Sequence, residues 1–266
     1  MLYPKLDLYN NYLKYSCVGH AFPDVTCKMT MNRINYAINL CEKWDNFMDI
    51  GGGDGKNAIA LSITFKKGTL VEIEKLDKHA EISKSFSNLS LFNDLIENYK
   101  TGIDTFDFIL LSDLFEHIPV ISTFVEQISN LQKVGGVIYI MTPNPIFCGP
   151  ATESEIYYKK LKYGHVNHYT IQEMVHIMKK HNYELIFQYY EESHLRRKIK
   201  DIIKSMDRHD IKWSKFIVYR MTRPIVVPLV KSLNKFLELW VYNNEIRNSN
   251  NPFSTITHDL AFKKIL

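Results

Sequence analysis

Short apolar runs alternate with helix-like stretches through the first half of the chain. Four such runs predict buried strands, at residues 47–50, 69–73, 106–112 and 137–141. Apolar positions with helical spacing predict three helices between them, at Lys56–Ile63, Asp77–Ser85 and Ile121–Leu131. Strands that alternate with helices indicate βαβ units, so we expect a mainly parallel sheet with right-handed crossovers.

The second half of the chain is less regular. Thr170 suits the N-cap of a helix over Ile171–His181, because its hydroxyl can accept a hydrogen bond from an early backbone N–H. Further elements are predicted as a turn at 134–136, a strand over Tyr183–Tyr190, a basic helical segment over 195–245 and a closing strand over Thr255–Lys263.

Length and charge favour one domain with an added segment. The chain has 266 residues, and α/β folds often reach ~250 residues as one unit. The formal net charge is only +4, but 13 basic residues stand against 5 acidic ones between Ser193 and Arg247. The basic character therefore belongs to one late segment.

Cysteine usage and the N-terminal sequence bear on the compartment. The four cysteines have no metal-ligand spacing and are expected to be reduced thiols. The N-terminus shows no apolar stretch of the signal-peptide kind, and Pro224–Val230 is far shorter than the ~20 residues needed to span a bilayer. We expect a cytoplasmic protein.

A glycine-rich turn follows the first predicted strand, where the chain reads Asp49-Ile50-Gly51-Gly52-Gly53-Asp54-Gly55. Glycines between a strand and a helix let the backbone bend sharply and approach a ligand. The dinucleotide pattern G-x-G-x-x-G fails because its third glycine position is Lys56, and the P-loop pattern fails at Ile50 and Asn57. The spacing that fits is D-x-G-x-G-x-G.

That spacing resembles the first motif of class I methyltransferases that use S-adenosylmethionine (SAM). The resemblance implies that the turn, from Asp49 through Gly51, Gly52 and Gly53 to Gly55, binds the cofactor. It also implies that Glu72, at the end of the second predicted strand, accepts hydrogen bonds from both ribose hydroxyls, which suits the two oxygens of a carboxylate. Glu74 is the alternative for this role.

Two downstream segments extend the resemblance. Asn93-Asp94-Leu95 is similar to the family segment that meets adenine, so Asp94 and Leu95 are expected there. Residues 112–117, which read Ser-Asp-Leu-Phe-Glu-His, resemble the segment after the fourth strand in the branch with quinone and sugar methyltransferases. Ser112 and Asp113 would line the methionine end of SAM, and S-adenosylhomocysteine (SAH) would be the product.

The resemblance also implies an architecture. We expect a Rossmann-like sheet of seven strands, mostly parallel, with helices on both faces and an antiparallel last strand. The whole chain, 1–266, would be a single domain. Its parts would be a helical lid over 1–45, a cofactor-binding core over 46–192, a basic helical insertion over 193–250 and the final strand over 251–266.

Three histidines are candidates for the methyl-transfer chemistry. A base that titrates near neutral pH can accept the proton of a hydroxyl acceptor, and histidine is the usual choice. His117 follows the third apolar run, while His165 and His168 lie in the loop after the next strand, which borders the acceptor pocket in this fold. His-x-x-His also raises the question of a metal, but the match to the superfamily's metal motifs is poor, and we expect none.

These observations favour O-methylation of a small polar metabolite, with a sugar or a phosphorylated or nucleotide-linked saccharide as acceptor. N-methylation of a small amine is the enzymatic alternative, and a non-catalytic SAM-binding or partner-binding protein is the alternative from another class. Residues 193–247 could contact an anionic membrane surface or a partner subunit. Nucleic acid is not expected as a partner, because the chain is only mildly basic and carries no RNA-binding motif. The sequence does not define the oligomeric state.

Overall fold

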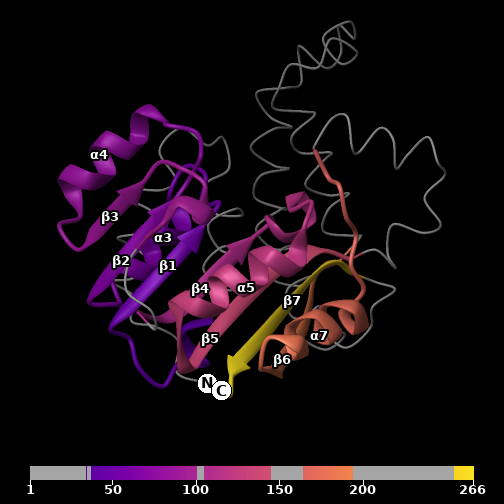
Figure 1. The fold of residues 1–266 in the computed structure, drawn as a ribbon. Coiled ribbons are helices and arrows are strands. Elements are labelled where there is room, and N and C mark those ends of the chain that lie inside the picture. The colour runs from indigo at the N-terminus through magenta and orange to yellow at the C-terminus, as the bar shows by residue number, and fades with distance from the viewer. Residues whose placement is uncertain (1–33, 35–36, 101–104, 145–163, 194–254) are drawn as a thin grey trace, which may run out of the picture. The chain divides into compact units, whose positions relative to one another are not determined.

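The computed structural model describes residues 34, 37–100, 105–144, 164–193 and 255–266. Seven strands form one sheet in the order β3-β2-β1-β4-β5-β7-β6 (Figure 1). Their bounds are Asn46–Ile50 (β1), Lys67–Val71 (β2), Leu89–Phe92 (β3), Phe106–Ser112 (β4), Gln132–Pro143 (β5), Tyr183–Ser193 (β6) and Thr255–Lys264 (β7). The α-helices are Lys56–Ser62 (α3), Asp77–Ser85 (α4), Ile121–Leu131 (α5) and Ile171–Lys180 (α7), and the 3-10 turns are Ile96–Asn98 (η1) and Phe115–His117 (η2).

The first five strands run parallel, and the seventh runs against its neighbours. β1 pairs in parallel with β2 and β4, β2 with β3, and β4 with β5. The backbone N–H of Ile265, just after β7, donates to the carbonyl of Asn182, just before β6, at 2.9 Å. This contact joins the end of β7 to the start of β6, so the two strands are antiparallel. The predicted Rossmann-like fold, with its antiparallel last strand, is confirmed.

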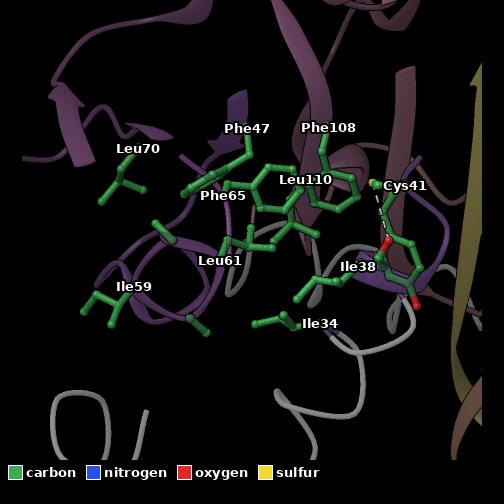
Figure 2. Packing of buried hydrophobic residues seen from close by; sticks show 14 of the residues in the cluster. Ile34, Ile38, Cys41, Phe47, Ile59, Leu61, Phe65, Leu70, Phe108 and Leu110 are labelled. Atoms are coloured by element: carbon green, nitrogen blue, oxygen red, sulfur yellow. Dashed lines mark hydrogen bonds between the residues drawn. The ribbon is translucent and has the colours of Figure 1, made fainter. Parts of the chain in front are cut away.

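Apolar side chains bury both faces of the sheet. On one face, α3 packs with Ile34, Ile38 and Cys41 against a group of aromatic rings (Figure 2). In this group Phe65 lies 5.3 Å from Phe47 and 5.7 Å from Phe108, centroid to centroid. Successive strand residues point to opposite faces, and the alternate positions Met48 and Ile109 are fully buried on the other side. The buried residues of α5 and α7 lie outside the first cluster. Helices therefore cover both faces.

Several predicted bounds differ from the structure: the second strand was expected at 69–73 but lies at Lys67–Val71, and the largest differences concern β5 and β3. Val134–Gly136 was expected to be a turn, but it lies inside β5, where the pairing with β4 shifts register between Phe106 and Phe108. Gly135 has φ of +83°, so the irregularity that predicted a turn marks a bulge. β3 was not predicted, since a four-residue strand at the sheet edge carries little apolar signal.

The chain forms two compact units, residues 1–189 with 258–266 and residues 190–257. Every site residue discussed below belongs to the first unit. The predicted lid over 1–45 lies mostly outside the described residues, and so does the predicted basic insertion over 193–250. Within the described part of the chain, no helix combines the length and apolar character required to cross a bilayer.

Candidate functional site

The glycine-rich turn connects β1 to α3 at the carboxyl edge of the sheet. Gly51, Gly53 and Gly55 have φ of +68°, +54° and +77°, a region that L residues with a side chain rarely adopt. The backbone N–H of Gly51 donates to Val71 at the end of β2, 2.8 Å away. A Cβ built on Gly53 would meet no atom within 4 Å, so the backbone at Gly53 borders open space. A ligand can therefore approach this part of the turn closely.

Asp49, the last but one residue of β1, is fully buried beneath the turn. No described residue gives either carboxyl oxygen a hydrogen bond of standard geometry. Burial raises the pKa of Asp49 to about 7, the Ala58 backbone N–H in the first turn of α3 opposes the rise, and the Glu72 carboxylate adds to it. A Cβ on Gly52 would lie 2.6 Å from Asp49 Oδ2, so the carboxyl group needs a glycine above it.

Glu72 follows β2 and reaches the turn from the neighbouring strand. Its Oε2 accepts a hydrogen bond from the Gly53 backbone N–H at 2.7 Å, and its Oε1 accepts one from the Glu74 N–H at 3.2 Å. Glu74 itself is exposed and supplies only this backbone contact among the described interactions. Of the two predicted alternatives, Glu72 is the carboxylate that lies at the turn.

His79 supports the same turn and was missed in the sequence. It lies in α4, is 2% exposed, and its Nε2 is 2.8 Å from the carbonyl oxygen of Gly53. Its Nδ1 accepts from the Leu76 N–H at 3.4 Å and from Asn93 Nδ2 at 3.2 Å. Two donors at Nδ1 require a lone pair there, so Nε2 carries the proton and donates to Gly53. Gly53 is therefore held from both sides, by Glu72 at its N–H and by His79 at its carbonyl.

The predicted adenine-side residues follow β3, next to β2. The Asp94 carboxylate accepts hydrogen bonds from the Leu95 N–H at 2.7 Å and from Asn98 Nδ2 at 3.0 Å. Both Asp94 and Leu95 are exposed. Asn93 also donates to the Glu72 carbonyl at 3.3 Å and so ties this loop to the end of β2.

The predicted methionine-side residues lie at the end of β4, on the other side of β1. Ser112 ends the strand and Asp113 follows with φ of +51°. The Asp113 N–H donates to the carbonyl of Met141 on β5 at 2.8 Å. The sheet order changes direction between β1 and β4, and the carboxyl edge at such a point is where open α/β sheets bind ligands. The predicted cofactor residues all lie along this edge.

The three predicted histidines lie together beside the end of β4. The His165 ring packs edge-on against His117, with centroids 4.9 Å apart, and against His168, at 5.6 Å. Residues 164–168 are attached to η2 by backbone hydrogen bonds, in which the Val166 and Asn167 N–H groups donate to the Glu116 carbonyl at 2.9 and 3.1 Å. Asn167 Nδ2 donates to Ile118 at 2.6 Å. The loop is thus fixed to the segment that carries His117.

Glu116 joins this histidine cluster and was not among the predicted catalytic residues. It is 1% exposed, and its Oε2 accepts a hydrogen bond from the Thr142 hydroxyl at 3.0 Å. Burial raises the pKa of Glu116 to about 7, and the Asp113 carboxylate adds to the rise. A buried acid between two strand ends is uncommon as a packing residue, because desolvation of its charge costs free energy.

The arrangement fits a SAM-like ligand. Gly53 offers open space and Glu72 presents a carboxylate beside it, while Asp49 places a buried carboxyl group beneath the turn. A ligand that carries a vicinal diol and positive charge matches this set of acceptors. The histidine cluster then lies farther along the same edge, on the β4 side.

Comparisons with known proteins agree with this geometry. The family model for a methyltransferase domain matches residues 27–188. No curated protein matches the chain. Solved structures with a similar fold include coclaurine N-methyltransferase bound to N-methylheliamine and SAH, with TM-score 0.60 and 14% identity over 98% of this chain and 79% of that one.

Two further similar structures come from named organisms. Phosphoethanolamine N-methyltransferase 2 from Haemonchus contortus, in complex with SAM, has TM-score 0.59 and 16% identity over 88% of this chain and 53% of that one. A protein from Galdieria sulphuraria, named provisionally as a sarcosine dimethylglycine methyltransferase, has TM-score 0.55 and 13% identity over 89% of this chain and 84% of that one. At these identities the likeness shows the fold.

Proposed function

Because the chain belongs to the family of SAM-dependent methyltransferase domains, we propose that it methylates a hydroxyl group of a small polar molecule held beside the histidine cluster. The observation that carries the proposal is the cluster of Glu116, His117, His165 and His168 at the end of β4, next to the predicted methionine-side residues. A hydroxyl acceptor must lose a proton during methyl transfer, and imidazole is suited to accept it near neutral pH.

In this proposal the chain's residues divide the work. Glu72 holds the ribose hydroxyls, and the backbone of the glycine-rich turn packs against the cofactor. Ser112 and Asp113 orient its methionine end. When bound, SAM supplies an electrophilic methyl group on a sulfonium, and loss of that methyl group leaves neutral SAH. A histidine of the cluster receives the acceptor proton, and the fixed loop 164–168 holds that imidazole in place.

The cofactor residues can be tested by calorimetry with SAH. Glu72→Gln should weaken SAH binding by about tenfold or more, since it removes charge-assisted hydrogen bonds worth ~1.5–3 kcal/mol each. Glu74→Gln is the matched control, because Glu74 is a neighbouring exposed acid, and it should bind SAH like the wild type. Equal losses in both variants would contradict the assignment of Glu72.

The acceptor atom can be tested with SAM that carries an isotope-labelled methyl group. The enzyme is incubated with a panel of sugars, sugar phosphates, nucleotide sugars and small amines, and the product's methyl resonance is read by NMR. A methyl group on oxygen supports the proposal, and one on nitrogen overturns it. A saccharide remains the preferred acceptor class on the basis of the basic segment 193–247, of which residues 194–247 lie outside the described residues.

N-methylation of a small amine is the second candidate. The similar structures include two N-methyltransferases and the protein named as a sarcosine dimethylglycine methyltransferase, and the carboxylates of Asp113 and Glu116 could attract an ammonium group. An amine needs less help from a base than a hydroxyl does. Replacement of all three histidines should therefore abolish O-methylation but leave measurable N-methylation.

A further inference from the structure

Three side chains from two segments of the chain bring potential metal ligands together at the end of β4. Glu116 and His117 come from η2, and His165 comes from the loop before α7. One carboxylate oxygen and one nitrogen from each imidazole all lie within 4.8 Å of one another. Around a tetrahedral metal with bonds of about 2.1 Å, ligand atoms are separated by about 3.4 Å. Small side-chain movements would therefore close the set around an ion.

The framework that holds these ligands is well fixed. The carbonyl of Glu116 accepts two backbone hydrogen bonds from the loop 164–168, and the Asn167 side chain donates a third bond to the carbonyl of Ile118, just after η2. His117 Nδ1 lies 3.2 Å from the carbonyl oxygen of Gly164 and donates to it. Such a carbonyl contact fixes the ring and leaves the Nε2 lone pair for a ligand, which is the arrangement seen at metal-binding histidines.

The electrostatics of the cluster also favour a cation. The Glu116 side chain is 1% exposed, and within the described residues its Oε1 has no hydrogen-bond partner. The groups that face it are the Thr142 hydroxyl, the two imidazoles and the Asp113 carboxylate. None of these four is a permanent cation. A buried carboxylate in such surroundings is costly unless it is paired or binds a metal.

We propose that Glu116, His117 and His165 bind one divalent cation of the zinc class at the acceptor end of the site. Two imidazoles and a carboxylate match the ligands of catalytic zinc and of other first-row metals, whereas Mg²⁺ and Ca²⁺ prefer oxygen ligands. This proposal replaces the expectation of a metal-free site. The metal proposal deepens the proposed function and rests on it in one respect, the presence of an acceptor hydroxyl beside the cation. Such a hydroxyl loses its proton more readily, and His168, which is not a metal ligand, accepts that proton.

The test measures metal binding directly on the full chain. The protein is stripped with a chelator and titrated with Zn²⁺ by calorimetry, and with Co²⁺ while its visible absorption is followed. We expect one equivalent to bind. Glu116→Gln and His165→Ala should each weaken binding more than about 100-fold, since even the outer partners of a metal site are worth ~10–100-fold. His176→Ala is the control, because His176 is an exposed histidine on α7, and it should bind like the wild type.

Each outcome decides the proposal. Circular dichroism and SAH calorimetry on the same samples report whether each variant is folded, and His117→Asn replaces any variant that is not. Absence of a stoichiometric site in the wild type overturns the proposal, and so does wild-type affinity in the ligand variants. SAH binding without a metal site would overturn the metal proposal alone. A metal site without SAH binding would instead count against the proposed function.

Discussion

Replacement of Asp49 by asparagine tests how the buried carboxyl beneath the glycine-rich turn affects stability. Burial raises its pKa from 3.8 to about 7, whereas the unfolded chain keeps an ordinary value of about 3.9. The folded state therefore holds the proton more tightly. The stabilising contribution of Asp49 is fully present below about pH 4 and is lost as the pH rises through about 7.

The size of the effect follows from the same values. A rise from 3.8 to about 7 corresponds to ~4 kcal/mol, at about 1.4 kcal/mol for each pH unit. About 3 kcal/mol of this change falls between pH 5 and pH 8. Asparagine does not titrate, so Asp49→Asn should gain ~3 kcal/mol in free energy of unfolding relative to the wild type over that range. Such a gain is a large part of the ~5–15 kcal/mol that stabilises a typical protein.

The assay is urea unfolding of the ligand-free protein, followed by circular dichroism at several pH values. Only the difference between variant and wild type is interpreted, because titrating groups that do not interact with Asp49, such as Glu116, contribute equally to both. Asp45→Asn is the control. Lys66 lowers the pKa of this partly exposed carboxyl, so its contribution is lost only at acidic pH. The difference of Asp45→Asn from the wild type should therefore be constant from about pH 5 to 8. A constant difference for Asp49→Asn would refute the reasoning.

Three further predictions follow from single contacts. His79→Phe removes the hydrogen bond to the Gly53 carbonyl and should weaken SAH binding by about tenfold. His79→Gln can still donate and should recover part of the lost affinity. Equal SAH affinity in both variants would contradict the role of His79 in holding the turn. Gly53→Ala has space for its Cβ and should cost only ~1–2 kcal/mol of stability through its positive φ. The added methyl group would occupy the space where the cofactor approaches the turn, so calorimetry should show SAH affinity lowered more than about tenfold. Tyr183→Phe leaves Gln132 Oε1 without the 2.7 Å hydrogen bond of the phenol and should lower the free energy of unfolding by ~1–3 kcal/mol in urea; unchanged stability would contradict the pairing.

Local signals predicted much of the fold. The helix after Thr170 begins where the N-cap was expected, because the hydroxyl accepts from the Glu173 N–H within one turn. The strand at Phe106–Ser112 was predicted with its observed bounds, since a fully buried parallel strand is apolar throughout. β5 was predicted too short because two glycines normally indicate a turn, and only the pairing with β4 shows that they belong to a bulge.

Site residues that belong to a sequence motif were predicted, whereas residues brought to the site only by tertiary packing were missed. Glu72 and the glycine-rich turn stand at a recognisable spacing, and the structure joins them through Gly53. His79 carries no local pattern, since its role comes from the position of α4 against the turn. Glu116 stood beside His117 in the sequence, but only the structure shows that its side chain is buried next to His165.

The position of β7 has a consequence for how the chain folds as it is made. β7 lies between β5 and β6, and its residues Leu260, Ala261 and Phe262 are fully buried. β6 therefore cannot join the sheet on the nascent chain until residues 255–264 have left the ribosome. During synthesis the half of the sheet from β3 to β5 can form before β6 joins it, because all five of its strands precede β6 in the sequence. Until then the edge of β5 stays unpaired, and this open strand edge exposes the partly folded chain to aggregation.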